Sequence, residues 1–301
     1  MMFQREKIAL YFRYALCRLA FTLTGKRMHP ELRGNMRQWV FYSVLKLKYA
    51  AFIQKQQKMH NAVHEYSDTV WWCWLQGEEN APPVVKTCLE SVRKNLPGKK
   101  IIVLTEENLW SYADFPDYII EKYRKGIISK AHFSDLLRIQ LLAQRGGTWI
   151  DSTVYCTGFP GYLFNTPLFA FKEKERSDPA IAASSWLMAA EKCNPIITLV
   201  RDLLFLYWKN HSRLYHYFLL HFFFTMATEA YQEEWDSVPF FSNLPPHILQ
   251  RELFAPYSQE RLRQIQRMSD IHKLSHKYDK SKGIHGTFLE HILTRGASHD
   301  A

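Results

Sequence analysis

The sequence contains little glycine and lacks the short motifs of several enzyme classes. Only 12 of its 301 residues are Gly, about 4%, where soluble proteins average about 7%. Neither G-x-G-x-x-G nor G-x-x-x-x-G-K-[ST] occurs, and G-x-S-x-G and H-E-x-x-H are missing as well. We therefore expect no glycine-rich nucleotide loop, no serine-hydrolase elbow and no zinc-protease helix.

Paired cysteines and long apolar runs are also missing. The 5 cysteines are scattered and none forms a C-x-x-C pair, which argues against a disulfide framework and a zinc cluster and is typical of a reducing cytoplasm. Residues 214–228 form an aromatic, apolar run without Lys, Arg, Asp or Glu. Because a membrane span needs roughly 20 apolar residues, this run predicts a buried helix. Near the N-terminus Arg13 and Arg18 interrupt the apolar stretch, so we expect no signal peptide.

The excess positive charge lies at one end of the chain. The net charge is +10, and residues 1–60 hold 12 Lys and Arg against two acids, Glu6 and Glu31, whereas residues 61–301 hold 27 of each sign. A basic arm on a neutral body indicates an attachment segment rather than a nucleic-acid-binding surface. We therefore divide the chain into a basic helical arm, residues 1–60, and a body, residues 61–301.

The arm contains an amphipathic segment that has two interpretations. An apolar stripe follows helical spacing between basic flanks, and it consists of Ile8, Phe12, Ala15, Leu16, Leu19 and Leu23. This pattern is typical of a helix that lies in a membrane interface. It is equally typical of a helix that packs on the core with its basic side in water. A second helix is predicted at 38–58.

The body predicts a sheet with helices between its strands. β-Branched and aromatic runs indicate strands, and helical spacing between proline and glycine signals indicates helices. Strands are predicted at 69–75, 100–104, 148–150, 168–171 and 181–187, and helices at 82–95, 130–144 and 194–231. Strands that alternate with helices are typical of an α/β fold.

One group of polar residues stands where such a fold binds ligands. Asp135 and Arg138 are three residues apart and share a helix face. Asp151 ends the strand that follows. In open α/β sheets, ligands bind beyond the carboxyl ends of the strands. Spacing alone leaves open whether this group is a ligand site or a structural ion pair with a strand-end cap.

The segment from about residue 70 to residue 160 resembles glycosyltransferase family 32, in particular its capsular polysaccharide synthesis proteins. It is more distantly similar to the catalytic domains of large glucosylating toxins. The matching pieces are Trp74-Leu-Gln76-Gly77, Ser134-Asp135-x-x-Arg138 and Gly146-Gly147-x-x-x-Asp151-x-Thr153. The resemblance implies a GT-A-like, Rossmann-type mixed sheet flanked by helices, with a nucleotide-sugar donor. It also implies that Trp74, with Gln76 and Gly77, binds the nucleotide, that Asp135 and Arg138 hold the sugar, and that Asp151 opens the Asp-x-Asp motif.

The second acid of that motif is replaced by Thr153 in this chain. The resemblance implies Mn²⁺ or Mg²⁺, which would neutralise the diphosphate leaving group. We expect Asp151, Thr153 and His272 to hold the metal. The segment 271–277 resembles the late His/Lys element of related transferases, which implies that Lys273 or Lys277 contacts phosphate, as lysine commonly does. A solvated basic turn is the alternative for this segment. Loss of one carboxylate leaves a metal-independent or inactive enzyme as the alternative.

The sequence therefore predicts a glycosyltransferase of capsular or extracellular polysaccharide synthesis. It would move a hexose, with retention by resemblance, from a nucleotide sugar to a glycan or lipid-linked glycan, and UDP is the default nucleotide. We expect it in the cytoplasm, on the inner face of an anionic membrane. Hexose-1-phosphate transfer and a non-catalytic carbohydrate-binding assembly subunit remain as alternatives.

Overall fold

The computed structural model describes residues 30–58, 65–164, 166–172, 180–279 and 281–297. The strands within these ranges are β1 (Thr69–Cys73), β2 (Lys100–Leu104), β3 (Gly147–Ile150), β4 (Val154–Cys156), β5 (Leu168–Lys172), β6 (Ala183–Ala190) and β7 (Ile271–Lys273). The α-helices are α2 (Pro30–Gln57), α3 (Pro83–Asn95), α4 (Asp117–Arg124), α5 (Lys130–Arg145), α6 (Pro195–Asn210), α7 (Leu219–Ala230), α8 (Gln232–Ser237), α9 (Ile248–Arg251), α10 (Gln259–Met268) and α11 (Phe288–Ala297).

A five-stranded mixed sheet lies at the centre of the molecule, in the order β2-β1-β3-β6-β5. β1 pairs in parallel with β2 and with β3, whereas β6 is antiparallel to both β3 and β5. β4 and β7 form a separate antiparallel pair. The predicted α/β class, a mixed sheet flanked by helices, is confirmed.

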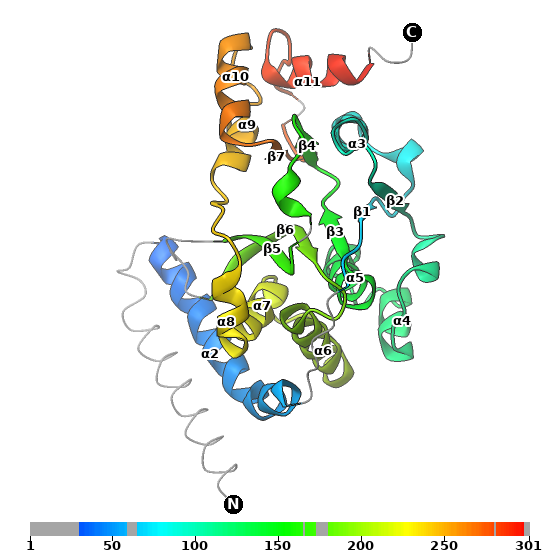
Figure 1. Cartoon of the computed structure of the whole chain (residues 1–301), viewed down its shortest axis with the longest axis vertical. Coiled ribbons are helices and arrows are strands. Elements are labelled where there is room, and N and C mark those ends of the chain that lie inside the picture. Colours follow the sequence, from blue (N-terminus) through cyan, green and yellow to red (C-terminus); the bar gives the residue numbers. More distant parts are fainter. Residues whose placement is uncertain (1–29, 59–64, 165, 173–179, 280, 298–301) are drawn as a thin grey trace, which may run out of the picture.

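Each face of the sheet is covered by its own helices and has its own core (Figure 1). Side chains alternate along β1, so Trp71 lies in the core beneath α5, α6 and α7, while Trp72 lies in the core beneath α3 and α11. Trp74 packs against the second core as well. Trp72 and Trp74 therefore share a face of the sheet, as alternation along a strand requires.

Helix α2 belongs to the first of these cores. Its Tyr42, Leu45, Tyr49 and Ile53 are buried there, and the Tyr42 hydroxyl donates to Glu229 of α7 at 2.6 Å. Residues 30–57 of the predicted arm therefore share the core of the body. The predicted helix at residues 8–23 lies outside the described residues. Within the described ranges no helix combines the length and the apolarity that a bilayer crossing requires.

The helical stretch predicted at 194–231 is two helices, α6 and α7. The predicted buried helix at 214–228 corresponds to α7, which is buried along most of its length. Between them the chain leaves helical geometry at His211. The Tyr207 hydroxyl fixes this loop, because it donates to the carbonyl of Arg213 and accepts from the amide of Tyr215. The break was not predicted because it contains neither proline nor glycine.

Candidate active site

Asp151 is fixed at the carboxyl end of β3 by backbone and side-chain hydrogen bonds. Its amide donates to the carbonyl of Trp186 in β6 at 2.9 Å. The indole Nε1 of Trp149, two residues earlier in β3, donates to Asp151 Oδ1 at 2.8 Å. These bonds fix the position of one carboxylate oxygen, which can therefore accept hydrogen bonds from neighbouring cationic side chains.

Two glycines set the approach of α5 to β3. Gly146 ends α5 with φ 66°, and Gly147 begins β3 with φ 100°. A Cβ on Gly147 would lie 2.4 Å from the carbonyl oxygen of Thr69. Only glycine combines this left-handed backbone with so close an approach to β1. The short Gly146-Gly147 connection therefore places α5 and its polar side chains next to Asp151.

Arg138 connects α5 to both neighbouring strands. Its Nη1 donates to the carbonyl and the hydroxyl of Ser185 in β6, at 2.7 and 2.8 Å. Its Nη2 lies 3.1 Å from Asp151 Oδ1 and 3.6 Å from Asp135 Oδ1. The side chain is 8% exposed, and its guanidinium lies over the Trp149 ring. The structure thus brings together Asp135, Arg138 and Asp151, as their spacing predicted.

Lys273 completes this group from a distant part of the chain. The pairing of β7 with β4 sets Lys273 opposite Val154. Its Nζ lies 2.9 Å from Asp151 Oδ2 and 2.6 Å from Thr153 Oγ1. An ammonium has three donors, and the third has no partner among the residues that the structure describes. The Lys273 side chain is 19% exposed, so it is partly accessible to solvent.

The two cations determine the charge state of Asp151. Burial alone would raise the pKa of the Asp151 carboxyl, but the charges of Lys273 and Arg138 outweigh it. Hydrogen bonds from Trp149 and Lys273 act in the same direction, so the pKa lies below its ordinary value. Asp151 is therefore a carboxylate at neutral pH, and both of its oxygens accept hydrogen bonds.

Asp135 has a buried histidine partner that the sequence reasoning missed. His132 Nδ1 lies 3.4 Å from Asp135 Oδ2, and its Nε2 accepts from the Trp208 indole at 3.0 Å. Because an indole N–H can only donate, Nδ1 carries the proton of the neutral ring and faces the carboxylate. His132 precedes Asp135 by three residues, so helical spacing was a signal that could have found it.

Trp74 and its neighbours form the outer part of the site. Trp74 follows β1 and meets the His276 ring edge-on, with 5.4 Å between the ring centroids. His276 lies three residues beyond Lys273, so the segment after β7 links Trp74 to the charged group. Gln76 is exposed, and Gly77 adopts φ 87° in the turn that follows. Lys277 is exposed, and no side-chain contact joins it to Asp151 among the described residues.

His272 lies away from the predicted metal position. Successive strand residues point to opposite faces, and His272 Nε2 lies 3.0 Å from Thr157 Oγ1 rather than near Asp151. Burial lowers the pKa of His272 to about 4, so the ring is neutral at physiological pH. Its predicted role as a ligand together with Asp151 is not compatible with this geometry.

The remaining donors do not fit a divalent cation. Asp151 and Thr153 face the ammonium of Lys273, and the other Asp151 oxygen faces Arg138 and Trp149. A metal bound between Asp151 and Thr153 would compete with a fixed positive charge. Within the described ranges no three His, Cys, Asp or Glu side chains are grouped as metal ligands would be. The predicted Mn²⁺ or Mg²⁺ site is thus not supported by the donor set.

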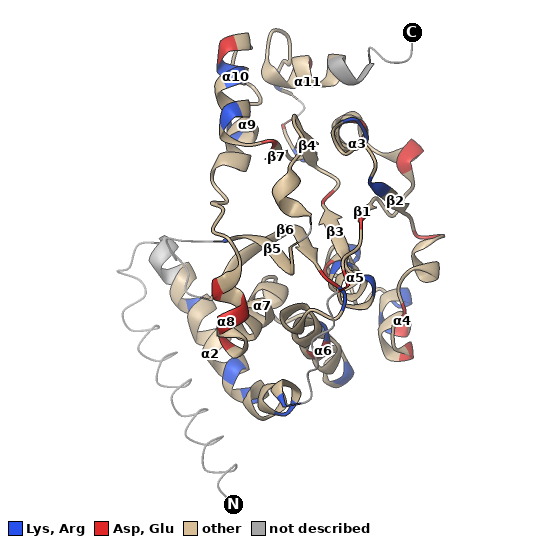
Figure 2. Cartoon of the chain, in the orientation of Figure 1, with Lys and Arg blue, Asp and Glu red and all other residues tan. Residues whose placement is uncertain are grey.

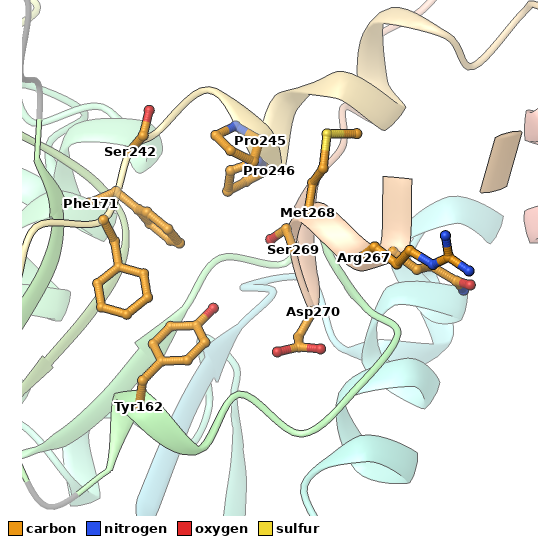
Figure 3. A pocket seen from close by; sticks show the side chains of 11 residues that line it. Tyr162, Phe171, Ser242, Pro245, Pro246, Arg267, Met268, Ser269 and Asp270 are labelled. Atoms are coloured by element: carbon orange, nitrogen blue, oxygen red, sulfur yellow. The ribbon is translucent and has the colours of Figure 1, made fainter. Parts of the chain in front are cut away.

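A pocket of about 270 Å³ lies at the other end of β7. Figure 3 shows the rings of Tyr162 and Phe171 on one side of it and Asp270 on another. Asp270 immediately precedes β7, whereas Lys273 ends that strand. None of the predicted site residues lines the pocket, so it is separate from the charged group.

The chain belongs to the capsular polysaccharide synthesis protein family, whose model matches residues 26–292. The resemblance inferred from the motifs is thereby confirmed. Among solved structures the chain is similar to the glycosyltransferase PaToxG, with 17% identity over 66% of this chain and 79% of that chain and a TM-score of 0.41. No curated protein matches the chain.

Proposed function

We propose that this chain transfers a sugar from a nucleotide-sugar donor to a glycan or lipid-linked glycan acceptor in capsule synthesis. One observation carries the proposal: Asp135, Arg138, Asp151 and Lys273 meet at the carboxyl end of β3. The donor carries a charged diphosphate and a sugar rich in hydroxyls. Fixed cations bind the first, and carboxylates with an arginine orient the second.

Buried polar atoms with no protein partner support a ligand at this position. Arg138 Nε and Trp74 Nε1 are buried and without a hydrogen bond among the described residues. Buried polar groups in proteins nearly always have partners, so each of these donors is open to a polar ligand. In the proposed complex Trp74 stacks on the nucleotide base, beside Gln76 and Gly77. Arg138 and Asp135 orient the transferred hexose, and retention at the anomeric carbon remains a prediction.

The test is a screen of UDP- and GDP-sugars for turnover by the full chain, with excess EDTA and separately with Mn²⁺. We expect one donor to be hydrolysed slowly to the nucleoside diphosphate, and faster with a glycan acceptor. Release of nucleoside monophosphate would instead indicate hexose-1-phosphate transfer. Calorimetry that detects no binding of any donor, together with no turnover, would contradict an enzymatic function.

The proposal includes contact with an anionic membrane surface, where lipid-linked acceptors reside. Besides the basic residues at 1–29, the described helix α2 supports it. Its Met36, Trp39 and Leu47 are 43%, 49% and 56% exposed. Lys46 and Lys48 flank Leu47, and Lys46 also pairs with Glu229 of α7 at 2.7 Å. Figure 2 shows the positive charge along this helix. Exposed aromatic and apolar residues among lysines are typical of helices that bind anionic lipid surfaces.

The vesicle-binding prediction follows from this surface. Full-length protein should co-sediment with phosphatidylglycerol vesicles and not with phosphatidylcholine vesicles. High salt should release it, because each basic residue contributes about 1 kcal/mol that salt screens. Trp39→Ser should weaken binding, whereas Met268→Ser on α10, where Met268 is 44% exposed against 49% for Trp39, should not. Equal behaviour towards the two vesicle types would contradict the membrane contact.

A further inference from the structure

The position between Asp151 and Thr153 is where the Asp-x-Asp resemblance predicts a divalent cation, and the Lys273 ammonium lies there instead. Its Nζ contacts Asp151 Oδ2 and Thr153 Oγ1 at 2.9 and 2.6 Å. The strand pairing that holds it is reinforced by the amide of Leu274, which donates to the carbonyl of Thr153 at 2.8 Å. The backbone of Thr153 and the backbone of Lys273 are therefore held together. The position of the Lys273 ammonium is set by this pairing as well as by its own hydrogen bonds.

Replacement of the second acid by a threonine agrees with this arrangement. An aspartate at position 153 would give the ammonium a second negative charge, whereas the Thr153 hydroxyl accepts its hydrogen bond as a neutral group. Asp151 is then the one carboxylate that pairs with both Lys273 and Arg138, so it offsets only part of their two positive charges. Counting Asp135, the four charged side chains sum to zero before a donor binds, so no additional cation is needed to balance the group.

We propose that Lys273 takes the place of the divalent metal, so that its ammonium contacts the donor diphosphate and transfer proceeds without metal. This inference rests on the proposed function and goes beyond it by identifying the cation that receives the leaving group. The third N–H of Lys273 is the donor that reaches the phosphate. Asp151 and Thr153 are positioning residues, which hold the ammonium in place.

The charge balance of the reaction fits a single fixed ammonium. In the transfer, the bond between the anomeric carbon and the bridging phosphate oxygen breaks, and its electron pair stays on that oxygen. The acceptor hydroxyl oxygen bonds to the anomeric carbon, and its proton passes to water. The nucleoside diphosphate therefore gains one negative charge as it leaves. A preorganised cation directed at that charge stabilises the transition state more than the ground state.

The first experiment compares turnover of one active nucleotide sugar by the full chain in excess EDTA and in Mn²⁺. We expect the two rates to agree within about twofold, since the cation is part of the protein. Turnover that disappears in EDTA and returns with Mn²⁺ or Mg²⁺ would overturn the inference while leaving the proposed function intact. Absence of turnover for every donor, with and without metal, would instead contradict the proposed function.

The second experiment changes the ammonium itself. Lys273→Met should reduce turnover in EDTA about 100-fold, because one preorganised donor to the leaving group is lost. Lys273→Arg keeps the charge and should retain most of the activity. Lys172→Met is the matched control, since Lys172 also ends a strand and is also partly buried, and it donates to the carbonyl of Trp235 outside the site. Full activity of a folded Lys273→Met protein would overturn the inference.

A binding measurement covers the case in which Lys273→Met fails to fold. Calorimetric titration of UDP, and separately of GDP, into the unaltered protein in EDTA should give saturable binding by one of them. The affinity should fall steeply with added salt, because the contact is between charges. If the nucleoside diphosphate of the active donor binds only after Mn²⁺ is added, the inference is wrong.

Discussion

Asp151→Asn should reduce sugar transfer by about 10² to 10⁴ while the chain remains folded. The carboxylate holds Arg138 through Oδ1 and Lys273 through Oδ2. Asparagine has the same shape, but only one side of its amide can accept a hydrogen bond. The other side presents N–H groups to a cation, which then loses its position. Arg138 and Lys273 would still carry their charges, so the loss of turnover would measure the effect of their displacement and not of their removal.

This result is measured as turnover of the active nucleotide sugar, with circular dichroism and thermal melting to verify folding. Asp202→Asn is a matched control, because Asp202 is 22% exposed against 21% for Asp151. It also pairs with an arginine, Arg201, but on α6 outside the site. Transfer at nearly the normal rate by folded Asp151→Asn would show that the site lies elsewhere.

Local patterns were sufficient to predict the elements of the central sheet but not their order. The runs that form β1 and β2 are apolar and β-branched, and their predicted positions agree with the structure. β4 has only three residues, and no periodicity can be recognised in so short a segment. The antiparallel insertion of β6 between β3 and β5 depends on contacts across the whole sheet. No local signal encodes such a pairing.

Local spacing predicted that some of the site residues lie together, but it could not predict contacts between distant segments. Asp135, Arg138 and Asp151 lie within one helix, one turn and one strand, so spacing alone brought them together. Lys273 was expected to contact phosphate, but its contact with Asp151 spans 122 positions and depends on the pairing of β7 with β4. His272 was predicted to bind metal, but its Nε2 lies 3.0 Å from Thr157 Oγ1, because neighbouring residues of β7 point to opposite faces.

Arg138→Met should lower the free energy of unfolding by about 3 to 5 kcal/mol and also abolish transfer. The guanidinium is nearly buried and lies close to the carboxylates of Asp135 and Asp151. Methionine has a similar length but offers no charge and no donors. Removal of one partner of a buried ion pair leaves the opposite charge uncompensated, which is the costly case. The carbonyl of Ser185 would lose its hydrogen bond as well.

Urea denaturation of the unaltered chain, Arg138→Met, Asp151→Asn and the double variant separates these contributions. Because the two side chains share a hydrogen bond, their effects should not add, and the coupling should be about 1 to 3 kcal/mol. Arg138→Lys retains the charge but cannot reach Ser185 and Asp151 simultaneously with a planar fork, so its stability should be intermediate. A loss below about 0.5 kcal/mol in Arg138→Met would place this arginine among ordinary surface residues, and its function as the link between α5, β3 and β6 would have to be abandoned.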